Sequence, residues 1–400
     1  MIKIVKNILY VNVIQMDAAD GYKDSLDEIL ELIPKHFVDK GPYSKKLYKL
    51  IGEGLKYYDR TNQNNMTLTV LTGDNMIMKA AGIYFPNQIQ EHIKTNLHKQ
   101  LHYRYHFPND RIMNVYFGLL DKQIVNYQAY HDMMRLVISW AYTCIKYSYK
   151  VCSRRQTIYF YLTDFKKILP HSNITTLDYN HINTGVTTRC AENNETIIYR
   201  KEEWFKVYIH EMMHSYGFDI SDTYRGMISE EIKKLFEIKS SMKIEEAYVE
   251  VWARIINSGY ASYFAAENEK DFEQLFLFTM EVERLFAVIQ AQKVLGFMNL
   301  SYDLVVTKGT RIAYNLYRER TNVFAYYILT AMFLNKPYDF MRFCSKINKK
   351  WLRFDNTVKA VKELESYIKS NYKDDAFLEN IRRKYKTRNR GLRMTLIEVN

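Results

Sequence analysis

The chain has 400 residues, of which 47% are hydrophobic and 26% charged, and its formal net charge is +12. This composition is typical of a globular protein with enough apolar material for two or three domains. The 14 glycines and six prolines are too few for long flexible linkers, so we expect helix to dominate.

The sequence shows no targeting or membrane signal. The segment Met1–Asn7 lacks an unbroken apolar run followed by a cleavage site, so no signal peptide is predicted. The most apolar long segment, 273–298, is interrupted by Glu281, Glu283 and Arg284, so no transmembrane segment is predicted either. The four cysteines form no C-x-x-C pair, so neither a zinc knuckle nor a disulfide framework is expected.

These observations predict an intracellular, cytoplasmic protein. The 34 tyrosines, together with many lysines, asparagines and isoleucines, are a bias that A+T-rich coding produces. Such coding is typical of large DNA viruses, which adds the hypothesis of a viral, virion-associated protein.

The N-terminal region, residues 1–124, is expected to be mainly helical. Its predicted helices have apolar residues at helical spacing and cover 25–33, 43–58 and 88–101. Two short strands are predicted, at 8–13 and 68–71.

The order of elements is more informative in the segment 125–268, which is the second predicted domain. A long apolar-periodic helix is predicted at 130–147. Three pieces rich in β-forming residues follow, at 156–162, 181–188 and 195–200. The last piece leads directly into a second apolar helix.

This second helix contains an H-E-x-x-H motif at residues 210–214. Residues four apart lie on one face of a helix, so His210 and His214 can present both imidazoles to one metal ion. Glu211 can reach a water on that ion without filling a ligand position, which is the arrangement of a zinc hydrolase. Gly217 lies where a glycine would end the helix. The alternative is an amphipathic helix with two ordinary histidines.

The motif and the order of elements before it resemble the catalytic subdomain of zincin metallopeptidases, over about residues 130–260. By this resemblance 125–268 is a zincin-like catalytic core. The resemblance implies an α+β, predominantly helical fold with a small twisted sheet over the metal helix. It also implies an edge strand that binds the substrate peptide as an added strand. The candidate is 181–188, with its central residues Thr184, Gly185, Val186 and Thr187. A plain hairpin in the core sheet is the alternative.

A zinc site with two histidines needs a third protein ligand and an open position for water. In the metzincin pattern this ligand would stand at Ile220, which cannot bind a metal, although Asp219 precedes it. In the gluzincin branch the ligand is a glutamate on a following helix, and 244–254 is strongly helical. By this resemblance Glu246 binds zinc, and Glu250, on the same face, accepts the other N–H of a ligating histidine. The alternative is that both are surface acids.

The resemblance therefore implies a zinc metallopeptidase, a hydrolase that holds one Zn²⁺ per chain through His210, His214 and Glu246. The ion lowers the pKa of its bound water, and Glu211 acts as the general base in the hydrolysis of a peptide or protein substrate.

The remainder, residues 269–400, is predicted to be a helical domain that ends in a basic tail at 382–393. Seven basic residues and no acid make this tail either a solvated segment or a contact for nucleic acid or an anionic surface. Two other functions therefore stay open. One is a zincin-like structural or interaction protein of a virion with weak or no turnover, and the other is a basic nucleic-acid-binding protein.

Overall fold

The computed structural model describes most of the chain, namely residues 22–34, 41–79, 82, 84–122, 124–385 and 389–399. The chain divides into two compact units, which are described separately. Unit 1 comprises 1–48, 167–182 and 219–400, and unit 2 comprises 49–166 and 183–218. The division predicted from the sequence, 1–124, 125–268 and 269–400, is a different one and stays a prediction. The predicted strand 8–13 lies outside the described residues.

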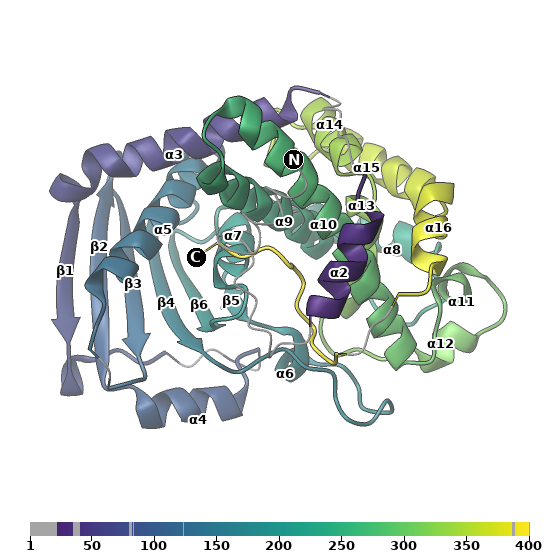
Figure 1. Cartoon of the computed structure of the whole chain (residues 1–400), viewed down its shortest axis with the longest axis horizontal. Helices are drawn as coiled ribbons and strands as arrows, with labels where there is room; N and C mark the ends of the chain where they lie inside the picture. Colours follow the sequence, from purple (N-terminus) through teal and green to yellow (C-terminus); the bar gives the residue numbers. More distant parts are fainter. Residues whose placement is uncertain are drawn as a thin grey trace. The chain divides into compact units, whose positions relative to one another are not determined.

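Unit 2 is built on a six-stranded mixed sheet with the order β1-β2-β3-β4-β6-β5 (Figure 1). The strands are β1 (Met66–Leu71), β2 (Lys99–Phe107), β3 (Arg111–Leu119), β4 (Arg155–Thr163), β5 (Gly185–Thr187) and β6 (Asn193–Arg200). Strands β3, β4 and β6 run parallel to one another. The other neighbours pair antiparallel. Because the strand order ends with β5, this strand forms one edge of the sheet, beside β6.

Helices pack on both faces of this sheet. On one face lie α5 (Tyr127–Tyr147) and α7 (Trp204–Ser215), which contact each other and pack on Phe117 and Phe160. On the other face α4 (Asn87–Asn96) packs on a cluster that includes Tyr159 and Tyr199. A strand buried on both faces has a continuous apolar run, which explains the sequence of β4. Most of α3 (Tyr43–Asn65) and the short 3-10 helix η3 (Gly73–Asn75) complete the unit.

The described residues of unit 1 are mainly helical. The helices are α2 (Lys23–Leu32), α6 (Tyr179–Ile182), α8 (Asp222–Lys233), α9 (Ile244–Ala265), α10 (Glu269–Phe297), α11 (Tyr302–Val306), α12 (Ile312–Leu316), the π-helix η4 (Phe324–Leu329), α13 (Thr330–Leu334), α14 (Pro337–Ile347), α15 (Val358–Asn371) and α16 (Asp375–Arg382). Helices α9 and α10 pack against each other, and both also contact η4 and α13. Nineteen residues of α9, from Ile244 to Ser262, are buried. We find no helix among the described residues with the length and apolar character that a membrane span requires.

The mixture of helices with a mixed sheet confirms the α+β fold class in its coarse form. The predicted helix 88–101 extends too far, because β2 already begins at Lys99, and β3 was not predicted. The predicted strand 181–188 is also too long. Only Gly185–Thr187 are extended, and α6 contains its first two residues.

The C-terminal segment 389–399 is not a solvated tail. Its residues Leu392, Leu396 and Ile397 are fully buried. Glu283 in α10 accepts hydrogen bonds from the hydroxyl of Thr395 at 2.7 Å and from the N–H groups of Leu396 and Ile397 at 2.7 and 3.0 Å. Within the predicted tail 382–393, the solvated alternative is therefore wrong for Leu392 and Arg393, which are buried in unit 1.

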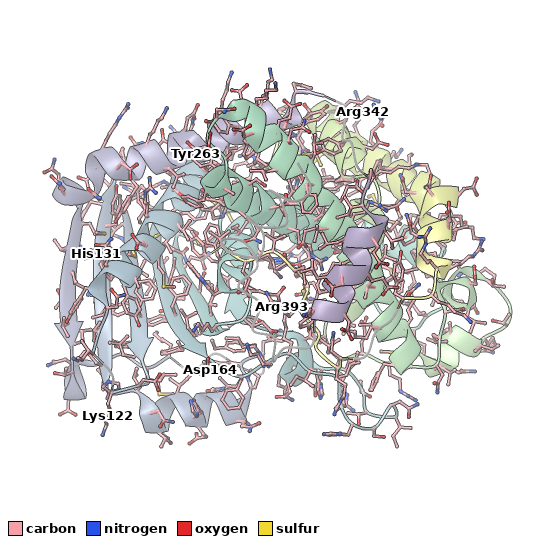
Figure 2. All side chains as sticks on the ribbon, viewed as in Figure 1. Lys122, His131, Asp164, Tyr263, Arg342 and Arg393 are labelled. Atoms are coloured by element: carbon pink, nitrogen blue, oxygen red, sulfur yellow. A yellow bond between two sulfur atoms is a disulfide. The ribbon has the colours of Figure 1, made fainter. Side chains whose placement is uncertain are left out.

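Several basic side chains of the predicted tail are held within unit 1. Arg393, labelled beside α2 in Figure 2, is buried and forms an ion pair with Glu398. Arg382 pairs with Asp303 at 2.6 Å, and Arg383 lies 3.7 Å from Glu379. These guanidinium groups already have carboxylate partners, so the geometry does not favour them as a contact for nucleic acid. Binding to an anionic partner stays a prediction.

Candidate metal centre

The H-E-x-x-H motif lies in α7, whose 12 residues are all buried. The helix follows β6 directly and lies against the sheet, where Phe160 contacts Tyr208. The hydroxyl of Tyr208 donates a hydrogen bond of 2.8 Å to the carbonyl oxygen of Val137 in α5. Packing on two sides therefore fixes the position of α7 in unit 2.

The C-terminal end of α7 forms a Schellman turn. The N–H of Phe218 donates to the carbonyl oxygen of Met213 at 2.9 Å, and the N–H of Gly217 donates to that of His214 at 3.0 Å. Gly217 has φ of +67°, in the left-handed region where glycine has no steric penalty. The prediction that this glycine ends the helix is confirmed.

The two histidines of the motif converge. His210 and His214 lie one turn apart, and their Nε2 atoms are 3.2 Å from each other. Two nitrogen atoms that bind one tetrahedral zinc ion at about 2.0 Å lie about 3.3 Å apart. The separation of the two imidazoles therefore fits a shared metal ion.

Glu211 lies beside the edge strand. A β-carbon added to Gly185 in β5 would lie 3.2 Å from Cγ of Glu211 and 3.0 Å from Cγ1 of Val207. Glycine is therefore the residue that lets β5 approach α7 this closely. Burial raises the pKa of Tyr199 in β6; the neighbouring Arg200 opposes this increase and Glu211 adds to it, so this hydroxyl stays protonated.

Glu246 is buried in the first turn of α9. The hydroxyl of Tyr326 in η4 donates a hydrogen bond of 3.1 Å to Oε2 of Glu246. Asn322 contacts the same hydroxyl at 3.4 Å. Sequence reasoning did not single out Tyr326, because no local pattern distinguishes it from the other tyrosines.

Glu250 is fully buried one turn further along α9. Its Oε1 accepts a hydrogen bond of 3.0 Å from Nε of Arg254, so a cation balances its charge. Its predicted role as acceptor for a ligating histidine stays a prediction.

Three buried side chains, His210, His214 and Glu246, form a group that could hold a metal ion. One ligand atom of each lies within 4.8 Å of the other two. Among the described residues no such group includes Asp219, so the metzincin alternative gains no support.

The expectation that the cysteines form no disulfide is wrong. Cys152 and Cys190 are joined, with their Cα atoms 4.4 Å apart. The parallel register of β4 and β6 places Arg155 opposite Asn193, and each cysteine lies three residues before one member of this pair. The pairing therefore follows from strand register, which the spacing of cysteines along the sequence does not show.

Comparison with protein-family models, with curated proteins and with solved structures finds no match to this chain.

Proposed function

We propose that the chain is a zinc-dependent metallopeptidase that resembles the gluzincins. The observation that carries this proposal is the buried group of His210, His214 and Glu246, with Glu211 inside the same motif. Two imidazoles and one carboxylate are the protein ligands of many catalytic zinc sites, in which a fourth position is left for water or substrate.

The residues present fit a zinc ion in two respects. The Nε2 atoms of His210 and His214 have the separation that one tetrahedral ion requires. All three ligand side chains are at most 9% exposed, so a bound ion would act in a site with little water. A zinc ion there would supply Lewis-acid polarisation of the substrate carbonyl and activation of a water molecule.

Glu211 is the proposed general base. Its place next to the first histidine on α7 lets its carboxylate take a proton from the attacking water and return it to the leaving amine. Tyr326 is proposed to donate a hydrogen bond to the oxyanion that forms on the substrate carbonyl. Its hydroxyl lies 3.1 Å from Oε2 of the proposed ligand Glu246 and is therefore next to the proposed metal position. The single O–H of Tyr326 donates to Glu246 in the absence of substrate and orients that carboxylate, and it would turn to the oxyanion as the oxyanion forms.

The edge strand β5 is the proposed substrate contact. It lies at the end of the sheet, antiparallel to β6, and its Gly185 adjoins Glu211. An extended peptide that adds to this edge through main-chain hydrogen bonds would bring its scissile bond close to the general base.

The first experiment is zinc content per chain by elemental mass spectrometry, for the wild type beside Glu246→Ala. We expect close to one zinc ion in the wild type and its loss in the variant. Glu211→Gln and Tyr326→Phe should retain zinc but lose at least about a hundredfold in kcat, because each removes a group that acts in the transition state.

Folded wild-type protein that contains no zinc would refute the proposed site. Full peptidase turnover by Glu211→Gln with zinc bound would refute the proposed role of this carboxylate.

A further inference from the structure

The last turn of α7 is held by two loops, and the disulfide joins them. The N–H of Cys190 donates a hydrogen bond of 3.3 Å to the carbonyl oxygen of His214. Ser153, directly after Cys152, donates from its hydroxyl to the carbonyl oxygen of Ser215 at 2.8 Å. The last carbonyl groups of a helix have no partner within the helix, so these bonds complete the turn that carries His214.

A side-chain network continues from this turn into the sheet. The hydroxyl of Ser215 contacts that of Ser153 at 2.7 Å and donates to Oε1 of Gln156 at 2.7 Å. Nε2 of Gln156 in turn donates to the hydroxyl of Thr196 at 2.9 Å. The end of α7 is therefore tied to β4 and β6 by polar groups close to the disulfide.

The disulfide also packs on the chain that leaves α7. A β-carbon at Gly217 would lie 3.3 Å from Sγ of Cys152 and 3.3 Å from Cβ of Cys190. A displacement of either cysteine would therefore act directly on the Schellman turn.

We propose that the Cys152–Cys190 disulfide is a redox-responsive positioning element for His214. This inference rests on the proposed metal function of that histidine. With the disulfide formed, the two loops hold the last turn of α7 and its imidazole. With the disulfide reduced, the loops lose their covalent link and keep non-covalent contacts, such as the hydrogen bond from the N–H of Ser153 to the carbonyl oxygen of Ala191 and the ion pair of Arg154 with Glu192. The last turn then opens more often, and the metal ion binds more weakly.

A reductant in solution can reach the disulfide at one of its two sulfur atoms. Cys190 is exposed, whereas Cys152 is fully buried. One thiolate of a dithiol reductant attacks Sγ of Cys190 and expels the thiolate of Cys152, which takes up a proton. The second thiolate of the reductant then breaks the mixed disulfide and releases Cys190. Two electrons and two protons pass to the cysteines, and the dithiol becomes a disulfide.

Hydrogen–deuterium exchange of the full-length, metal-free protein tests the positioning directly. Three samples are compared: the disulfide form, the same protein after dithiol reduction and removal of the reductant, and Cys152→Ser/Cys190→Ser. We expect the peptide 212–218 to exchange about tenfold faster in the last two samples. Peptides from the centre of α5 should be unchanged. Equal exchange of 212–218 in all three samples, or faster exchange throughout unit 2, would overturn the proposal.

Zinc affinity, measured by competition with a chromophoric chelator, is the second readout. We expect binding to weaken about tenfold on reduction and in the double serine variant. The control is the double variant given the same dithiol treatment, which should not change. It retains the buried free thiols of Cys144 and Cys344 and therefore detects any effect through them.

The two proposals fail in different ways. A disulfide form that binds no zinc refutes the metallopeptidase, while the exchange data still decide whether the disulfide holds the end of α7. Unchanged zinc affinity in a protein that does bind zinc refutes the positioning of His214.

Discussion

Gly185 is the residue at which the edge strand and the proposed general base can be tested together. In Gly185→Ala the new Cβ would lie 3.0 Å from Val207, 3.1 Å from the carbonyl oxygen of Ile197 and 3.2 Å from Glu211, so β5 and α7 must move slightly apart or their side chains must shift. We expect kcat/KM for a peptide substrate to fall at least about tenfold while zinc is retained, because a displaced base transfers protons less efficiently. Steady-state kinetics with zinc analysis measures both.

A matched control exists at Gly226, an exposed position in α8 where an added Cβ meets no atom within 4 Å. Gly226→Ala should leave kcat/KM unchanged and stabilise the protein by up to about 1 kcal/mol, since alanine is the better helix former. If Gly185→Ala were as active as this control, the edge strand would not constrain Glu211.

The predictability of the site residues depends on how local their pattern is. His210 and His214 could be predicted because helical periodicity alone places them on one face. Glu246 lies on a different helix, so only the resemblance to a family pointed to it. Tyr326 and the Cys152–Cys190 pair could not be predicted, because tertiary packing brings each to its partner.

Among the elements, those with a long apolar pattern were predictable. The helices α5, α7 and α9 and the buried strand β4 agree with the expected segments. Strand β2 was missed because its first residues, Lys99 and Gln100, continue the polar pattern of α4. Its apolar alternation also consists largely of tyrosines, which are frequent throughout the chain. Local pattern therefore identified the site helix better than the sheet that supports it.

The π-helix η4, which carries Tyr326, begins beside a partly buried carboxyl group. Glu319 accepts a hydrogen bond of 2.7 Å from the N–H of Phe324 and one of 2.9 Å from the hydroxyl of Tyr317. Desolvation raises the pKa of Glu319 from 4.5 to about 7. The folded protein therefore binds this proton more tightly than the unfolded chain. The resulting stability is fully present below pH 4.5 and is lost as the pH rises towards 7.

Urea unfolding at a series of pH values checks this expectation with Glu319→Gln as the comparison. Between pH 4.5 and pH 8 the wild type should lose about 3 kcal/mol more of its unfolding free energy than the variant, which has no carboxyl group to titrate there. Parallel pH profiles for the two proteins would show that the environment of Glu319 does not hold the proton.

At the scale of the whole molecule, unit 1 is completed by its C-terminal segment. Glu283→Ala removes the acceptor for the hydroxyl of Thr395 and for the N–H groups of Leu396 and Ile397. The hydroxyl of Thr395 can still donate to the carbonyl oxygen of Ile397 at 3.2 Å, but the two N–H groups lose their acceptor. Buried donors without a partner cost about 1–3 kcal/mol each, so we expect a loss of at least about 2 kcal/mol in unfolding free energy. Denaturant titration gives the value.

Glu281→Ala is the matched control on the same helix. Glu281 forms a partly buried pair with Arg284 at 2.8 Å that still contacts solvent, and solvated ion pairs contribute at most about 1 kcal/mol. A loss from Glu283→Ala no larger than that from Glu281→Ala would mean that the C-terminal segment does not depend on this carboxylate.

The division of the chain also has a consequence for the order of events during synthesis. The sheet of unit 2 uses only residues up to 218, so all of its strand pairs can form while the rest of the chain is still being made. Unit 1 cannot be completed at that stage, because it includes residues from both ends of the chain. The hydroxyl of Tyr22, at the start of α2, accepts its hydrogen bond from the N–H of Arg393, across 371 positions of sequence. Helix α2 therefore cannot complete its contacts until nearly the whole chain has been made, and the unit that carries Glu246 is completed last.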